Sequence, residues 1–323
     1  MDKVKIGFIG AGGIANAHLN NLSRMKDVEI TALCDIVKEK AETVAQKFGG
    51  KVYLDYRRML DREKLDALYI CVPPFAHQDQ EILACQKKIP FFVEKPVALS
   101  LEKARKIEEQ VKKSGVITSV GYVLRYMDIV ERTAQILSGR SPGLITGSYY
   151  GEVPGADWLI KKNRGGGQLV EQATHIVNLM LFFGGKVTEV YSRSFTGIIN
   201  QRIPGYEVED ASATVFRFAG GAVGSINCTW LAFGYKSSLG IVTDGLLVDW
   251  SPITTMQVTT AEKKEEYTVK NDFGFAEHRT FIDAVKTGNR KPVLSDYSDG
   301  VKTLKITLAA VKSMETGKPV KLT

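Results

Sequence analysis

The stretch VKIGFIGAGGIA, residues 4–15, decides the fold of the first part of this chain. Its apolar start at Val4 is typical of a buried strand, and it leads into a turn that fits the pattern G-x-G-x-x-A. Glycines permit a tight turn and let the backbone approach a pyrophosphate, while the following helix offers N–H groups to that anion. The stretch predicts a dinucleotide site with contacts from Gly10, Gly12, Gly13 and Ile14.

Asp35 ends the next predicted strand, residues 28–35, and lies 20 positions after Ala15. This is the spacing expected for a carboxylate that binds ribose hydroxyls. A carboxylate repels a 2′-phosphate, and Ile36 and Val37 follow with no arginine that would hold one. We therefore expect NAD as cofactor, with NADP as the alternative because Lys38 is close.

A second decisive stretch is FFVEKP, residues 91–96, an apolar strand that ends abruptly in charged residues. A lysine at the mouth of a buried strand is costly unless the fold uses its charge, and the proline restricts the backbone around it. We expect Lys95 at the reactive end of the dinucleotide site, oriented by Glu94. Three residues after the third strand complete the expected cofactor contacts: Pro73, Pro74 and His77. For His77 a structural role is the favoured alternative.

The order of predicted elements indicates an α/β fold with two domains. Up to about Gly121 strands alternate with helices, which predicts a doubly wound parallel sheet, a Rossmann domain, over residues 1–121. After Tyr122 alternating strands dominate and predict an α+β domain over residues 122–323 with a large, mainly antiparallel sheet. The strands expected there are 144–150, 187–195, 211–218 and 222–230, and the expected helices are 126–137, 171–183, 276–287 and 298–314.

Composition restricts the class of protein. The 323 residues are 44% hydrophobic and 24% charged, which suits two globular domains without a membrane helix or a signal peptide. The net charge of +7 is spread along the chain, so we expect no nucleic-acid partner. The four cysteines form no C-x-x-C pair and predict buried thiols in a reducing cytoplasm.

The block GGGQLVEQATHIVN, residues 165–178, contains the second candidate group. On one helix Glu171 and His175 would be i,i+4 neighbours, with Asn178 on the same side. A carboxylate beside an imidazole suits proton transfer, although a surface pair on an ordinary helix is the alternative. A zinc site would need a third ligand, and none stands out, so we expect no metal. His18 is expected to be structural and His278 to lie at the surface.

The chain resembles the glucose-fructose oxidoreductase/inositol dehydrogenase/rhizopine catabolism (Gfo/Idh/MocA) family through GAGGIA, EKP and GGG-x-x-x-E-x-x-x-H, in that order. The resemblance implies hydride transfer between NAD(P) and a hydroxyl carbon of a sugar, cyclitol or derivative. It also implies that Lys95 and His175 are catalytic, that Glu171 supports His175, and that the bond before Pro96 is cis. Glu171 and Asn178 stand where the family usually has aspartates.

The resemblance further implies that substrate lies between Lys95 and His175. Arg125 is similar to the family's arginine at the domain junction. Asp157 and Trp158, before the glycine triplet, are expected to bind a sugar by a carboxylate and an aromatic face. Two other functions remain open: an NAD-dependent glycoside hydrolase with transient redox, and a non-catalytic cofactor sensor. The long strands after residue 187 predict an uncovered sheet face, and hence a homodimer or homotetramer.

Overall fold

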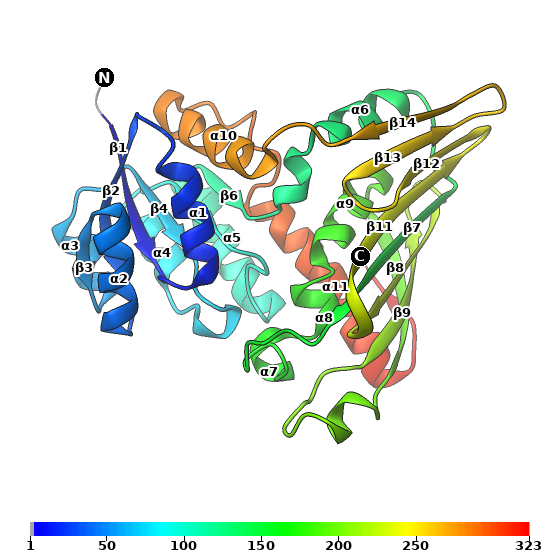
Figure 1. Cartoon of the computed structure of the whole chain (residues 1–323), viewed down its shortest axis with the longest axis horizontal. Helices are drawn as coiled ribbons and strands as arrows, with labels where there is room; N and C mark the ends of the chain where they lie inside the picture. Colours follow the sequence, from blue (N-terminus) through cyan, green and yellow to red (C-terminus); the bar gives the residue numbers. More distant parts are fainter. Residues whose placement is uncertain (1–2, 323) are drawn as a thin grey trace. The chain divides into compact units, whose positions relative to one another are not determined.

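The computed structural model describes residues 3–322. These residues form two compact units: one takes the chain up to Tyr126 together with Asp272–Val301, and the other takes Met127–Asn271 together with the chain from Lys302 on. The predicted boundary after residue 121 places residues 272–301 in the second domain, whereas they pack with the first unit. Each unit has its own sheet (Figure 1).

The first unit contains a six-stranded sheet in the order β3-β2-β1-β4-β5-β6, with every pair parallel. Its central strands β4 and β5 are buried on both faces, as parallel sheets covered by helices require. The strands are β1 Val4–Ile9, β2 Val28–Cys34, β3 Lys51–Tyr53, β4 Ala67–Ile70, β5 Phe91–Val93 and β6 Thr118–Val120.

Helices connect these strands, and local sequence signals set several of their ends. Helix α5 begins after Ser100, whose hydroxyl accepts a hydrogen bond from Lys103 N–H, and ends at Gly115 in the left-handed conformation. Ser100 and Gly115 are residue types that favour these two caps. The helices are α1 Gly13–Leu22, α2 Lys38–Phe48, α3 Tyr56–Arg62, α4 Gln80–Gln86 and α5 Leu101–Ser114, with short 3₁₀ turns η1 Pro74–Ala76 and η2 Val123–Tyr126.

Helix α10, Phe273–Thr287, returns from far along the chain to complete the core of the first unit. Phe281 packs edge-on against Tyr69, with ring centroids 5.7 Å apart. Asp27, before β2, forms ion pairs with Arg279 at 2.8 Å and with Lys286 at 2.6 Å. Apolar packing and charge therefore both fix α10 to this sheet.

The second unit is built on a nine-stranded sheet in the order β14-β13-β12-β11-β7-β10-β9-β8-β15. Every pair is antiparallel except β7 and β10. The strands are β7 Leu144–Glu152, β8 Val187–Phe195, β9 Ala211–Phe218, β10 Val223–Thr229, β11 Leu231–Thr243, β12 Leu246–Trp250, β13 Thr255–Thr259, β14 Lys264–Thr268 and β15 Val320–Lys321.

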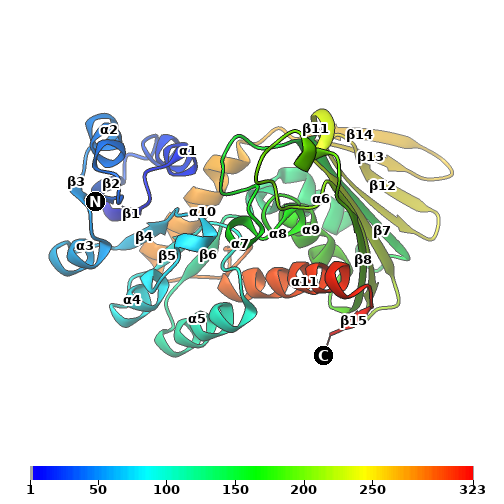
Figure 2. The same ribbon diagram turned by 90° about the horizontal axis from the view of Figure 1, so that it is seen from below.

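Helices cover one face of this sheet (Figures 1 and 2). Helix α9 lies so close to β7 that a Cβ atom at Gly147 would come within 2.7 Å of Ile176 Cγ2. Helix α11 is tied to β8 because Ser313 Oγ accepts a hydrogen bond from Ser192 N–H at 2.9 Å. The remaining elements are α6 Asp128–Ile136, α7 Lys162–Gly165, α8 Gln168–Glu171, α9 Thr174–Gly184, η3 Ile199–Gln201 and α11 Tyr297–Thr316.

The other face carries exposed apolar side chains. Val223, Leu144, Val242 and Leu247 lie opposite one another on β10, β7, β11 and β12, and form a row across four neighbouring strands. Each is between 38% and 48% exposed. We call these four residues the apolar row.

The predicted fold class is confirmed by the two sheets. The predicted strands 187–195 and 211–218 match β8 and β9, and the glycine hairpin at Gly220 and Gly221 joins β9 to β10. The strands after residue 231 had not been predicted individually. Within residues 3–322, no helix combines the length and apolar character that a membrane crossing requires.

Candidate active site

The glycine turn after β1 has the geometry that a bound pyrophosphate needs. Gly10 has φ +97°, and a Cβ atom there would lie 2.5 Å from the carbonyl oxygen of Cys71, so no larger residue fits. At Gly12 and Gly13 a Cβ atom would meet nothing within 4 Å. Gly10 is thus required by the positive φ and by the close approach of the Cys71 carbonyl. Gly12 and Gly13 leave the outer surface of the turn open.

The amino-terminus of α1 is available to an anion. Gly12 is the N-cap residue, and in the described part of the chain no side chain caps the helix. Its first turn contains no acidic residue. Uncapped N–H groups and the positive end of the helix dipole therefore face the open side of the turn. These features fit a dinucleotide pyrophosphate, as the sequence predicted.

Asp35 connects this turn to the end of β2. Its Oδ2 accepts a hydrogen bond from Ala11 N–H at 2.8 Å, and its Oδ1 accepts one from Val37 N–H at 2.9 Å. Each carboxylate oxygen retains acceptor capacity for a ribose hydroxyl. Ile36 beside it is 90% exposed, and an exposed apolar side chain at this place suits contact with an adenine ring.

His77 lies in a different environment from the other predicted cofactor contacts. It follows η1 and is buried, with Nδ1 2.5 Å from Oε1 of the buried Glu81. Its carbonyl oxygen accepts a hydrogen bond from Lys103 Nζ. These contacts favour a structural role, whereas Pro73 is half-buried at the mouth of β4. Direct cofactor contact by His77 stays a prediction.

The EKP segment follows the buried strand β5. Glu94 is 8% exposed, Lys95 is half-buried, and the peptide bond between Lys95 and Pro96 is cis, as the family resemblance implied. Glu94 Oε2 accepts a hydrogen bond from Lys95 N–H at 3.2 Å, and Glu94 Oε1 lies 2.9 Å from His18 Nε2. Glu94 thus contacts the backbone of Lys95 and a buried histidine.

His278 is buried. The expectation that it lies at the surface is therefore wrong. His278 is 1% exposed, and its Nε2 lies 3.0 Å from His18 Nδ1. Its position in the apolar packing between α10 and the sheet was not visible in the sequence, because α10 had been assigned to the other domain.

The second group lies in the other unit, and its helix is interrupted. Glu171 is the last residue of α8 and His175 is the second residue of α9, so the expected continuous helix 171–183 was wrong. Ala173 N–H donates to the carbonyl of Gln168, five residues earlier, which breaks the regular helix ladder. The i,i+4 argument for Glu171 and His175 therefore does not hold as it was stated.

Glu171, His175 and Asn178 are all buried or half-buried. Glu171 is 7% exposed, Asn178 is 1% exposed, and His175 is half-buried. Asn178 Nδ2 donates to Thr303 Oγ1 at 2.9 Å, which ties α9 to α11. Asn178 thus has a structural contact where the family usually has an aspartate.

Glu209 was missed by sequence reasoning. It is buried, and its Oε1 accepts a hydrogen bond from the backbone N–H of Gln168 at 3.1 Å, at the start of α8. Gly167, at φ +100°, approaches so closely that a Cβ atom there would lie 3.0 Å from the same oxygen. Burial raises the pKa of Glu209. The only sequence signal was an acidic pair, Glu209 and Asp210, just before a strand.

The predicted substrate contacts differ in accessibility. Asp157 is exposed and Trp158 half-buried, in the turn before α7. Arg125 is 7% exposed, its Nη2 donates to the carbonyl of Leu294 at 2.9 Å, and burial lowers its pKa. The substrate-binding role of these three residues stays a prediction.

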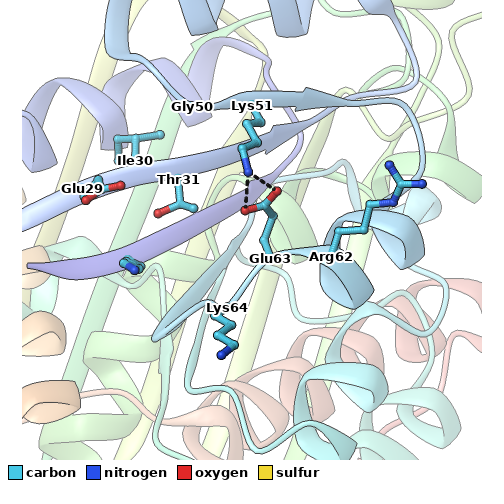
Figure 3. Close-up of a pocket in the computed structure, with 9 residues that line it drawn as sticks. Glu29, Ile30, Thr31, Gly50, Lys51, Arg62, Glu63 and Lys64 are labelled. Carbon is cyan, nitrogen blue, oxygen red and sulfur yellow. Dashed lines mark hydrogen bonds and ion pairs between the residues drawn. The ribbon is translucent and has the colours of Figure 1, made fainter.

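One pocket of the first unit lies away from the cofactor end. It lies beside β2 and β3, where Lys51 and Glu63 point toward one another and pair at 3.0 Å (Figure 3). Lys5, near the start of β1, also lines it. Ligands of open parallel sheets bind at the carboxyl ends of the strands, so this pocket is on the wrong edge for a dinucleotide. No cluster that could hold a metal ion occurs among residues 3–322.

Comparison with known proteins identifies the family. Residues 4–122 match the family described as "Oxidoreductase family, NAD-binding Rossmann fold", and residues 142–245 match the "GFO/IDH/MocA C-terminal domain". The chain belongs to the Gfo/Idh/MocA oxidoreductase family. The resemblance seen in the sequence is confirmed, and so is the NAD-binding domain.

Relatives within the Gfo/Idh/MocA family match over nearly their whole length. Myo-inositol 2-dehydrogenase of Thermotoga maritima is 25% identical and covers 99% of this chain and 98% of its own length. An NAD⁺-dependent scyllo-inositol 2-dehydrogenase of Bacillus subtilis is also 25% identical, over 99% and 96%. Levoglucosan dehydrogenase in complex with NADH and L-sorbose has the same fold, with a TM-score of 0.90 at 20% identity and full coverage of both chains.

Proposed function

We propose that this protein is an NAD-dependent dehydrogenase that oxidises a secondary hydroxyl group of a cyclitol, a sugar or a sugar derivative. The observation that carries the proposal is the EKP lysine at the carboxyl end of β5 in an NAD-binding unit. Full-length relatives named as inositol dehydrogenases support this substrate class.

In the proposed mechanism Lys95 and His175 act on the same substrate oxygen. His175 takes the hydroxyl proton as general base, and Lys95 binds the oxygen and stabilises the negative charge that develops on it. Glu171, buried just before the break between α8 and α9, stabilises the imidazolium. When bound, NAD supplies the hydride acceptor.

The cofactor preference in this proposal is NAD over NADP. The Asp35 carboxylate accepts hydrogen bonds from two backbone N–H groups, so it is held in place where a 2′-phosphate would be repelled. The residues that follow are Ile36 and Val37, both exposed and uncharged.

A substrate screen with purified protein tests the function. Inositols, other polyols, aldoses, sugar acids and glycosides are incubated with NAD, and NADH formation is followed by absorbance. We expect NADH with at least one cyclitol or sugar. Glycoside cleavage without NADH would instead show a hydrolase with transient redox, and NAD binding without turnover of any compound would show a cofactor sensor.

We also propose a homo-oligomer in the cytoplasm. The apolar row supports the oligomer, because an exposed apolar stripe across four strands is costly in water and is commonly covered by a second copy through a symmetric interface. Four buried free thiols support a reducing compartment.

A further inference from the structure

A line of hydrogen bonds runs through the interior of the first unit and ends at the EKP segment. Glu94 Oε1 lies 2.9 Å from His18 Nε2, His18 Nδ1 lies 3.0 Å from His278 Nε2, and His278 Nδ1 lies 3.3 Å from the Tyr69 hydroxyl. The four residues come from four elements or their ends: β5, α1, α10 and β4. Each is less than a tenth exposed. We call this line the buried chain.

Burial fixes the protons at the far end of the buried chain. It raises the pKa of Tyr69 well above its usual value, so the hydroxyl keeps its proton. Burial, reinforced by the neighbouring His18, lowers the pKa of His278 well below its usual value, so this imidazole is neutral. The only hydrogen bond of the Tyr69 hydroxyl within residues 3–322 goes to His278, and we take Tyr69 as the donor to Nδ1.

The remaining proton positions follow in sequence. A neutral imidazole has one N–H group, so His278 with an accepting Nδ1 donates from Nε2 to His18 Nδ1. His18 then carries its own proton on Nε2 and donates it to the Glu94 carboxylate. The second oxygen of Glu94 accepts the backbone N–H of Lys95 at 3.2 Å. Two N–H donors favour the ionised form of a carboxyl group.

The other ionisable groups around Glu94 agree with a single negative charge there. Glu277, next to His278 on α10, is 1% exposed, and burial together with the charge of Glu94 raises its pKa well above the usual value. Glu277 therefore stays protonated. The Cys71 thiol at the end of β4 has its pKa raised well above its usual value by burial and by Glu94, and stays neutral. The hydroxyl of Tyr126 on η2 has its pKa raised by burial and by the nearby Glu277, and stays neutral.

We propose that His18 and His278 are positioning residues, which hold the Glu94 carboxylate ionised and oriented beside Lys95 through the order Tyr69 to His278 to His18 to Glu94. The role rests on the proposed function, because it acts through Lys95. Gly121 belongs to the same arrangement: a Cβ atom there would lie 2.5 Å from Glu94 Oε1, so only glycine leaves this oxygen its place against His18.

Histidine NMR tests the proton order without any substrate. The chain contains four histidines, so protein labelled with ¹⁵N-histidine gives a small set of ring signals, which the single variants His18→Gln and His278→Gln assign. We expect both residues to carry the proton on Nε2, and His278 to stay neutral between about pH 5.5 and 8, where a free imidazole titrates. A proton on His278 Nδ1, or a charged His278 in this range, overturns the proposed order.

Kinetics test the effect on Lys95. His18→Gln keeps an N–H donor near the Nε2 position, whereas His18→Met removes it at similar size. We expect His18→Met to lower kcat roughly ten- to hundredfold, as loss of a hydrogen bond to a charged group does. KM for NAD and the thermal midpoint should stay close to those of the unmodified protein, and His18→Gln should restore most of kcat. Gly121→Ala should reproduce the loss by displacing Glu94 from a different side.

Equal kcat values for His18→Met and His18→Gln, with Gly121→Ala also normal, would refute the positioning role. If the unmodified protein oxidises no hydroxyl compound with NAD, the proposed function fails separately. In that case the ring-nitrogen pattern of the labelled protein alone decides whether the buried chain is ordered as proposed.

Discussion

Lys95 and His175 are the residues on which the proposed chemistry depends most directly. Lys95 is half-buried two residues after a fully buried strand, and His175 is half-buried near the start of α9. Partial burial leaves each side chain accessible to a small substrate while it reduces the screening of charge by water. Their replacement should therefore affect chemistry more than folding.

His175→Ala should lower turnover about 10²- to 10⁴-fold, the range for a single general acid–base group. Lys95→Ala should cost at least as much, because it removes stabilisation of a developing charge. Glu171→Gln, which keeps the shape of the side chain, should cost less. Steady-state kinetics with separate NAD titrations measure these effects. A folded His175→Ala protein with near-normal turnover would exclude His175 as the base.

Asp35 should control the choice of cofactor. Isothermal titration should show tighter binding of NADH than of NADPH to the unmodified protein, and Asp35→Ala should narrow the difference because it removes repulsion of the 2′-phosphate. Asp35→Asn is the matched variant, since it removes the charge but keeps an acceptor oxygen for one of the two backbone N–H groups, of Ala11 or of Val37. Equal or tighter binding of NADPH by the unmodified protein would contradict this assignment.

At the scale of elements, helix α10 shows how a distant segment becomes part of the first unit. It brings Phe281 and His278 into contact with the aromatic side chain of Tyr69. It also brings Arg279 and Lys286 to Asp27. These two cations lower the pKa of the Asp27 carboxyl below its usual range in the folded protein.

The Asp27 ion pairs should make stability depend on pH. Because the pKa of Asp27 is lowered on folding, its contribution is present above the unfolded pKa of about 3.9 and declines as the pH falls further. Asp27→Asn should therefore lower the free energy of unfolding by about 1 kcal/mol at neutral pH, the upper range for exposed pairs, and by less near pH 3. Urea unfolding at the two pH values measures this.

Asp283→Asn is the control for this experiment. Asp283 pairs only with Arg279 among these groups, and its side chain is 58% exposed, so its loss should cost less than that of Asp27. A difference between Asp27→Asn and the unmodified protein that is as large at pH 3 as at pH 7 would show that packing, and not charge, accounts for it.

At the scale of the whole molecule, the nine-stranded sheet leaves one face uncovered by its own helices. The apolar row crosses β10, β7, β11 and β12 on that face. Burial of apolar area contributes about 25 cal/mol per Å², so a second copy of the row is a favourable partner. The sheet that supports His175 would then also support assembly.

Light scattering at micromolar concentration should show a dimer or a dimer of dimers. Val223→Glu combined with Leu144→Glu places two charges in the apolar row and should shift the protein towards the monomer. Leu54→Glu is the control, because Leu54 is 51% exposed and belongs to the first unit, which contains no strand of this sheet. A monomeric unmodified protein would contradict the proposed assembly.

The sequence determined the features that depend on neighbouring residues. The strand, glycine turn and helix over residues 4–22, the capped helix α5, and strands β8 and β9 could be predicted from it. Glycine conformation, capping by a hydroxyl group and alternation of apolar residues act within a few positions of the chain. Asp35 was found for the same reason, since its distance from the turn is set by one strand–turn–helix unit.

Tertiary structure decided the features that join distant segments. The return of α10 to the first unit, the burial of His278 beside His18, and the contact of Glu209 with the start of α8 connect residues that are far apart in the chain or in separate elements. The break between α8 and α9 belongs here too, because Gln168 is held by Glu209 while α9 packs on β7. Such contacts depend on which surfaces meet in the folded chain, and no local pattern of residues encodes that.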